Sequence, residues 1–462
     1  MHKGLTGNRI FLFLLVLILA AMSPLGALAQ TTSTPPPQPD YTRPTVLTRP
    51  VNPPPSALPE IAAPDIEPPV YEPIVRTQGL LVESLDGKIV MEQAADQAFN
   101  PASAVKLGTA LTALRTFGVD HRFSTAVWTD GIFDSATGTI TGDLIVSGRD
   151  PSFGYEHAIM IARELNRQGI RVVTGDLIVA PGFTMNYDWS AQHSGDRFYD
   201  TLDMTRRPAL ATRIWLEDRA AVGDTASLQS TPSVAVMGAV YVDPVPAKAR
   251  TLLIHRSSTL VDILKVLLCY SNNFMAERIG DNLGGAGGVQ RFLTQALELK
   301  AGEIKLASTS GLGVNRVTPR AMMKIFRELR VELAKHNLSP SDIMPVAGVD
   351  PGTLQKRYTL DPFRGSVIAK TGTLIRTDGG ASALVGQMRT RSGQTLLFVI
   401  FNQRGNVLRF RQAQDALVAQ VQNSYGGPAP FEYRPLTLAM RLAGTELKAT
   451  PARTDEYEPG SN

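Results

Sequence analysis

The chain has 462 residues, and 43% of them are hydrophobic, which is sufficient for folded cores and excludes a wholly disordered protein. Its single cysteine excludes a disulfide framework, a cysteine-based zinc site and an iron–sulfur cluster. The 46 Lys and Arg exceed the 42 Asp and Glu by only four, and no basic stripe accompanies them, so the composition does not indicate nucleic-acid binding.

Residues 1–29 have the pattern of a signal peptide. Lys3 and Arg9 precede the apolar run 10–21, and Ala27-Leu28-Ala29 is typical of a cleavage site. An uncleaved anchor helix is the alternative, but the apolar run is short for a bilayer span. We therefore expect a periplasmic or secreted protein, cleaved near Ala29, whose net charge falls from +4 to +2 with the loss of the two basic residues.

Residues 30–75 are predicted to form a disordered linker, because they hold 14 of the 32 prolines. Proline lacks a backbone donor and fixes φ, so this stretch cannot build a packed core. It is either a simple spacer or a tether that holds the folded part away from a surface. At the other end, residues 443–462 are predicted to be a polar tail.

Strand patterns at both ends of the folded part predict an antiparallel sheet. Residues 80–83 and 88–92 flank an Asp-Gly turn and read as a hairpin. Residues 367–372, 383–390 and 394–402 form the later strands, the last two joined at a Ser-Gly turn.

The first candidate site lies at the start of a predicted helix that ends near Phe117. Asn100 suits the N-cap and Pro101 the first helical position, and Leu107, Leu111 and Leu114 share one face. Ser103 and Lys106 are three residues apart, so their side chains also share a face. A buried lysine of lowered pKa is a suitable base to activate a serine nucleophile. Helix capping by Ser103 with a solvated Lys106 is the alternative.

The second and third candidate sites are also short polar motifs beside apolar segments. Ser271 and Asn273 lie at a predicted turn between two buried helices, the first opened by a capping box at Thr259. Lys370-Thr371-Gly372-Thr373 prolongs a predicted strand, where a lysine and two hydroxyls suit a carboxylate and Gly372 permits close approach of a substrate backbone. Each motif alone is weak evidence.

The order Ser-x-x-Lys, Ser-x-Asn, Lys-Thr-Gly is that of the penicillin-recognising serine acyltransferases. The chain from Gln78 to Gln422 resembles one family of them, the class C low-molecular-mass penicillin-binding proteins, which are DacB-like D-alanyl-D-alanine carboxypeptidases and endopeptidases. Further segments that carry the resemblance are Gly142-Asp143-Leu144, Gly148-Arg149-Asp150-Pro151, Gly175-Asp176-Leu177, Ala276-Glu277, Ser310-Gly311-Leu312, Asn315-Arg316, Thr318-Pro319 and Pro345-Val346-Ala347-Gly348-Val349-Asp350.

The resemblance implies an α/β (α+β) fold. Residues 76–120 and 256–442 would form a β-lactamase/transpeptidase-like domain, an antiparallel sheet flanked by helices. Residues 121–255 would be a β-rich insertion, with strands expected at 144–147, 177–180 and 234–241. The insertion is shorter than usual for the family, so one or two accessory domains remain.

The resemblance also implies the catalytic roles. Ser103 would attack the carbonyl between two D-alanines of a peptidoglycan stem peptide, and Lys106 would take its proton. Ser271 would relay a proton to the leaving amine, and Asn273 would hold the peptide amide and Lys106. Water would then release the shortened peptide.

The implied binding residues are Lys370, Thr371, Gly372 and Thr373, which would hold the terminal carboxylate, while the backbone N–H groups of Ser103 and Thr373 form an oxyanion hole. β-Lactams would be covalent inhibitors. No cofactor or metal is implied, and the six histidines show no ligand spacing. The oligomeric state and the balance between carboxypeptidase and endopeptidase activity are not predicted.

Four features depart from or extend the family pattern. Ala180 stands where an acid often binds the far amino group of a diaminopimelate side chain, which puts that preference in doubt. Arg357 matches a position that meets the side-chain carboxylate. Pro351 is an extra residue, and Ser308-Thr309 replaces the usual Asp-Gly.

The sequence disfavours three other functions. A class A β-lactamase needs a deacylating glutamate in Glu-x-Glu-Leu-Asn, but here Ala162 precedes Glu164-Leu165-Asn166. The intact motifs argue against a non-catalytic wall-binding relative. The sequence contains no Gly-x-Ser-x-Gly motif, which argues against a Ser-His-Asp hydrolase of that type. Cys269, close to Ser271, lies on an apolar helix and is interpreted as a core residue.

Overall fold

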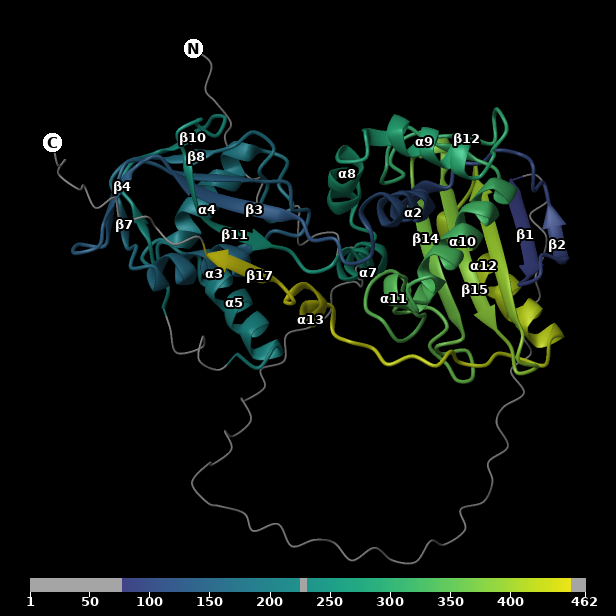
Figure 1. Cartoon of the computed structure of the whole chain (residues 1–462). Helices are drawn as coiled ribbons and strands as arrows, with labels where there is room; N and C mark the ends of the chain where they lie inside the picture. Colours follow the sequence, from purple (N-terminus) through teal and green to yellow (C-terminus); the bar gives the residue numbers. More distant parts are fainter. Residues whose placement is uncertain (1–76, 225–230, 450–462) are drawn as a thin grey trace, which may run out of the picture. The chain divides into compact units, whose positions relative to one another are not determined.

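The computed structural model describes residues 77–224 and 231–449 (Figure 1). The predicted signal peptide 1–29 and linker 30–75 lie outside the described residues, as does the end of the predicted tail. Within the described ranges, no helix is both long and apolar enough to cross a bilayer.

The central sheet has five strands in the order β14-β15-β16-β1-β2, and every neighbouring pair is antiparallel. The predicted hairpin and the three later strands are confirmed. Their bounds are β1 Gln78–Ser84, β2 Ile89–Gln93, β14 Val367–Leu374, β15 Ala381–Arg389 and β16 Thr395–Gln403.

Helices cover both faces of this sheet because its strands bury side chains in alternation. Leu81 packs into the core with α2, α7 and α10, whereas Leu80 and Val82 pack into the core with α12. The helices of this part are α2 Val105–Phe117, α7 Leu260–Tyr270, α8 Asn273–Asp281, α9 Gly285–Ala296, α10 Pro319–Ala334, α11 Pro340–Ile343, α12 Val407–Ser424 and α13 Leu438–Leu442, with the short turns η1 Ala102–Ala104 and η2 Thr377–Gly379 and the strand pair β12 Ile304–Lys305 and β13 Arg316–Val317. The α/β architecture expected from the sequence is confirmed.

The segment between α2 and α7 has its own sheets and its own apolar core. One sheet runs β10-β8-β6-β3-β11-β17, whose last strand β17 (Glu446–Ala449) comes from beyond α13, and the other runs β4-β5-β7-β9. The bounds are β3 Ser124–Thr129, β4 Ile132–Asp134, β5 Thr139–Thr141, β6 Leu144–Gly148, α3 Tyr155–Arg167, β7 Val172–Val173, β8 Leu177–Val179, α4 Ala191–Leu202, α5 Ala209–Ala221, β9 Ala235–Val236, β10 Val240–Val242 and β11 Arg250–Arg256. The domain boundaries at 121 and 255 and the number of accessory domains stay predictions.

Two local predictions differ from the structure. The single strand expected at 234–241 is wrong, because β9 and β10 belong to different sheets. Between them, a Cβ at Gly238 would lie 2.6 Å from Gly175 O, so the chain passes close to a neighbouring backbone there. Residues 446–449, expected in the polar tail, form β17 (Glu446–Ala449), which pairs with β11.

Candidate active site

Ser103 lies in η1, the short turn that leads into α2. Asn100 Oδ1 accepts a hydrogen bond from Ala102 N at 3.1 Å, but the prediction of Asn100 as the N-cap and Pro101 as the first helical residue is wrong, because Pro101 is the N-cap of η1 and Ala104 that of α2. Ala102 has a φ of +46°, which is uncommon for alanine and turns the chain sharply before Ser103. A Cβ at Gly311 would lie 2.0 Å from Ala102 O, so only glycine lets that loop pack against this turn.

Lys106 is fully buried one helical turn after Ser103. Its Nζ lies 3.0 Å from Ser103 Oγ, and it donates to Asn273 Oδ1 at 2.7 Å and to Ser310 O at 2.5 Å. Burial, together with the nearby charge of Lys370, holds the pKa of Lys106 well below its usual range. A neutral amine at this distance from a hydroxyl is a suitable general base.

Ser271 and Asn273 occupy the tight turn between α7 and α8, as predicted. Thr259 caps α7 by accepting from Asp262 N, and Ser271 ends this helix in the left-handed conformation, with φ +56°. Asn272 then caps α8 by accepting from Met275 N at 3.0 Å. One helix thus ends and the next begins within three residues, and Ser271 Oγ contacts Lys370 while Asn273 Oδ1 contacts Lys106.

The Lys-Thr-Gly-Thr motif lies on β14, the edge strand of the central sheet. Lys370 Nζ donates to Ser271 Oγ at 2.9 Å and to Thr371 O at 2.6 Å. Burial lowers the pKa of Lys370 to about 7. A Cβ at Gly372 would lie 2.5 Å from Pro101 O, so glycine lets β14 contact the turn that carries Ser103.

Glu277, on α8, positions the loop around Ser310, whose carbonyl oxygen accepts a hydrogen bond from Lys106. It accepts from Ser310 N at 2.9 Å, from Thr309 N at 3.3 Å and from Thr309 Oγ1 at 2.7 Å. Burial alone would raise the pKa of Glu277, but the bonds from Ser310 and Thr309 lower it overall. Glu277 therefore fixes the loop whose carbonyl oxygen binds Lys106. From the sequence, Glu277 is recognisable only as part of a family motif, and its role depends on contacts that the sequence does not show.

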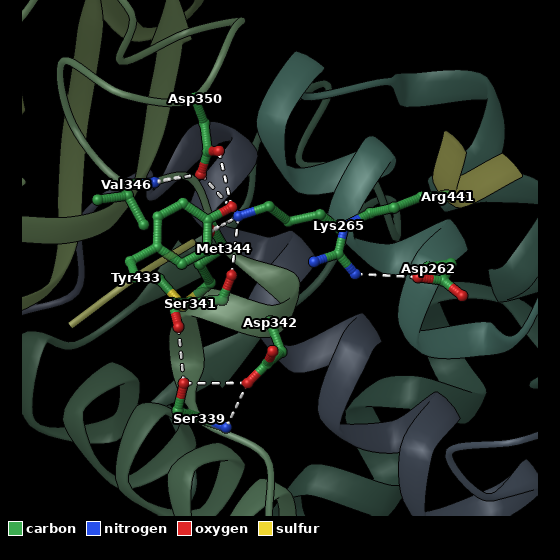
Figure 2. Close-up of polar contacts among 10 residues, drawn as sticks. All are labelled: Asp262, Lys265, Ser339, Ser341, Asp342, Met344, Val346, Asp350, Tyr433 and Arg441. Atoms are coloured by element: carbon green, nitrogen blue, oxygen red, sulfur yellow. Dashed lines mark hydrogen bonds and ion pairs between the residues drawn. The ribbon is translucent and has the colours of Figure 1, made fainter. Parts of the chain in front are cut away.

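A second buried polar cluster anchors α7 (Figure 2). Lys265 is fully buried, and its Nζ donates to Ser341 O at 2.8 Å, to Met344 O at 2.7 Å and to Asp350 Oδ2 at 2.7 Å. Asp350 also accepts from Tyr433 Oη at 2.8 Å. A buried ion pair is tolerated only when its remaining polar atoms have partners, and here both charges have several.

This cluster connects the helix of Ser271 to the strand of Lys370. Asp350 Oδ2 accepts from Val346 N, and the segment around Val346 runs along β14. Ala347 N donates to Val367 O at 2.9 Å, and Ala369 N donates to Pro345 O at 3.3 Å. Lys265 therefore connects the middle of α7 to the segment that runs along β14. This lysine was missed because it lies in an apolar run whose other residues explain the helix.

Two other residues named in the sequence analysis, Cys269 and Arg357, contact none of the three motifs through a side-chain hydrogen bond in the described part of the chain. Cys269 is fully buried, and burial raises the pKa of its thiol to about 12, which confirms that it is a core residue. Arg357 forms an ion pair with Asp415, with Nη2 and Oδ1 2.5 Å apart, and its side chain is 11% exposed. Its role as a substrate-binding residue stays a prediction.

The three motifs thus converge in one polar centre, although they lie far apart in the sequence. It contains a serine hydroxyl beside a base of lowered pKa, and a second serine beside a second lysine. Such a pairing suits covalent catalysis through an acyl-enzyme. A residue outside the motifs, Arg411 on α12, also contacts the centre through Thr373.

Comparison with known proteins agrees with this chemistry. The D-Ala-D-Ala carboxypeptidase 3 (S13) family matches residues 72–222 and 225–424. The D-alanyl-D-alanine carboxypeptidase of Actinomadura sp. (strain R39) is 27% identical over 453 residues, which cover 76% of this chain and 82% of that protein. The D-alanyl-D-alanine carboxypeptidase DacB of Haemophilus influenzae is 24% identical, covering 65% and 79%.

Solved structures show the same fold. The predatory endopeptidase Bd0816 of Bdellovibrio bacteriovorus has a TM-score of 0.67 and 22% identity, over 80% of this chain and 99% of that one. Penicillin-binding protein 4 (DacB) of Haemophilus influenzae has a TM-score of 0.55 and 21% identity, over 77% and 96%. The resemblance to low-molecular-mass penicillin-binding proteins is confirmed, and the chain belongs to the D-Ala-D-Ala carboxypeptidase 3 (S13) family.

Proposed function

We propose that this protein is an exported serine-type D-Ala-D-Ala carboxypeptidase/endopeptidase that acts on peptidoglycan stem peptides through an acyl-enzyme on Ser103. The observation that carries the proposal is the fully buried Lys106, whose Nζ lies 3.0 Å from Ser103 Oγ and whose pKa is lowered by burial. Membership of the family supports the reaction class. Export rests on the pattern of residues 1–29 alone.

In the acylation step, Lys106 takes the Ser103 hydroxyl proton as Oγ attacks the carbonyl of the penultimate D-alanine. The carbonyl oxygen becomes an oxyanion that the N–H groups of Ser103 and Thr373 stabilise. Collapse breaks the C–N bond, and the leaving amine receives a proton through Ser271, which Lys370 contacts. Asn273 fixes Lys106 and is available to the substrate amide. Water then hydrolyses the ester and regenerates Ser103.

The position of β14 supports substrate binding along Thr371–Thr373. β14 is an edge strand, and the segment around Val346 pairs with it only near Ile368. A strand at the edge of a sheet can accept an extended peptide as a further strand. The carboxylate after the scissile bond would then lie near Thr371 and Thr373.

A labelling experiment tests the proposal. The purified protein should be labelled by a fluorescent penicillin, and Ser103→Ala should abolish labelling. Ser392→Ala, at an exposed turn, serves as the control and should label normally. Among the structural relatives, Bd3459 of Bdellovibrio bacteriovorus is described as acylated by penicillin G. An unlabelled wild type would refute the proposal.

Two turnover measurements, one with muropeptides and one with benzylpenicillin, distinguish carboxypeptidase, endopeptidase and β-lactamase activity. Digestion of monomeric and cross-linked muropeptides, read by mass, separates carboxypeptidase from endopeptidase. A long-lived penicilloyl enzyme is expected, because Glu164 lies on α3 and pairs with Arg167 at 2.8 Å rather than with a site residue. Rapid hydrolysis of benzylpenicillin would contradict this expectation.

A further inference from the structure

Arg411 is a guanidinium beside the carboxylate-binding motif. It lies in the second turn of α12, which Asn406 starts by accepting from Leu408 N and Arg409 N. Its Nη2 donates to Thr373 Oγ1 at 2.9 Å. Thr371 and Thr373 are two residues apart on β14, so their side chains leave the strand on the same face. Arg411 therefore stands on the threonine side of this edge strand.

The charge of Arg411 has no carboxylate within ion-pair distance among residues 77–224 and 231–449. The nearby Asp415, one helical turn further along α12, is instead bound by Arg357 through Nε at 2.9 Å and Nη2 at 2.5 Å. Burial and the neighbouring charge of Arg357 lower the pKa of Arg411, although an arginine stays charged at any working pH.

Three other partly buried arginines of the same part of the protein differ in this respect, although Arg330 on α10 also forms no ion pair among the described residues. Arg115 pairs with Glu328 and Glu332, Arg316 with Asp378, and Arg327 with Glu83. A partly desolvated guanidinium that donates to one hydroxyl still has N–H groups available for another acceptor. The planar arrangement of these N–H groups matches the two oxygens of a carboxylate.

We propose that Arg411 binds the carboxylate that follows the scissile bond, together with Thr371 and Thr373, and so selects substrates whose leaving residue carries a free carboxylate. This inference rests on the proposed function of the same site. Arg411 would then be a specificity-determining residue on α12, outside the three motifs. The same carboxylate exists on a terminal D-alanine and on a cross-linking residue bonded through its α-amine, so both peptidase activities would depend on Arg411.

The test compares two substrates on the same enzyme: an N-acylated peptide that ends in D-Ala-D-Ala, and its C-terminal amide. The wild type should have a higher kcat/KM for the acid. Arg411→Gln should reduce the acid-to-amide ratio by roughly 10- to 100-fold, the effect of one charge-assisted hydrogen bond. Arg411→Lys should retain part of the preference. A ratio measured within one variant does not depend on the folded fraction.

Arg409→Gln is the matched control, because Arg409 lies on the same helix and is exposed. It should leave the ratio unchanged. An equal loss of kcat/KM on both substrates in Arg411→Gln would mean that Arg411 only supports β14, and would overturn this inference alone. A wild type that fluorescent penicillin does not label would overturn the proposed function and the inference with it.

Discussion

The cluster around Ser103 and the cluster around Asp350 both contain buried lysines, but the lysines have opposite roles in the two. Lys106 and Lys370 are fully buried beside hydroxyl, amide and carbonyl oxygens, and burial lowers the pKa of both. Lys265 is equally buried, but its Nζ lies 2.7 Å from the carboxylate of Asp350. The first arrangement makes an amine available for proton transfer, whereas the second makes a structural ion pair.

The comparison shows that burial alone does not make a lysine catalytic. Desolvation favours the neutral amine, and an adjacent carboxylate favours the ammonium. Among the described residues, the acid closest in effect to Lys106 is Glu277, whose oxygens are already used by Thr309 and Ser310. The same substitution, lysine to methionine, should therefore have opposite consequences at the two clusters.

The largest effect on activity is expected at Lys106. Lys106→Met removes the base that takes the Ser103 proton, so the acylation rate should fall by roughly 10²- to 10⁴-fold. The free energy of unfolding should change little by comparison, because methionine fills a similar volume and no buried carboxylate loses its partner. Penicillin acylation kinetics and urea unfolding measure the two quantities. A variant that acylates at the wild-type rate would contradict the role of Lys106 as the base.

The largest effect on stability is expected at Lys265. Lys265→Met leaves Asp350 buried without its cation, which costs about 3–5 kcal/mol of unfolding free energy. Acylation should decline less than in Lys106→Met, since the serine–lysine pair itself is untouched. Urea unfolding at neutral pH is the measurement.

A double replacement separates the unpaired charge from the loss of packing. Lys265→Met with Asp350→Leu removes both charges, and it should recover much of the stability lost in the single variant. If the double variant is no more stable than Lys265→Met, the ion pair is not the source of the effect.

The contrast between the clusters also explains what could be predicted from the sequence. Strand alternation, the cap at Thr259 and the helix at Leu107, Leu111 and Leu114 are local signals, so these elements were predicted correctly. The three motifs were found because their residue types carry chemistry. Whether the three motifs meet is a question of tertiary structure, which only the resemblance to a family addressed.

The remaining contacts have no local signal. Lys265 and Asp350 are 85 residues apart, and a lysine in an apolar helix reads as a surface residue unless its partner is known. Helix α12 was not predicted, so neither Arg411 nor its contact with Thr373 could be anticipated. β17 pairs with β11, a strand almost 200 residues earlier, and the local sequence of neither strand indicates this pairing.

A smaller, pH-dependent effect is expected at Lys370. Its pKa of about 7 means that its positive charge is nearly complete well below pH 7, is half lost at about pH 7 and disappears as pH rises further. Since the charged form attracts an anionic substrate, kcat/KM should decline on the alkaline side of about pH 7. In Lys370→Arg the guanidinium does not titrate, so this decline should disappear even though overall activity falls. The same alkaline limb in both proteins would assign it to another group.

The smallest effect is expected at Tyr433, which contacts both members of the structural pair. Its Oη donates to Asp350 Oδ1 at 2.8 Å, and its ring lies 4.8 Å from Lys265 Nζ. Tyr433→Phe keeps the ring and removes one of several bonds to Asp350, so the unfolding free energy should fall by about 1 kcal/mol. Tyr433→Leu also removes the ring and should cost more. Equal stability of the two variants would assign the whole contribution of Tyr433 to its hydroxyl.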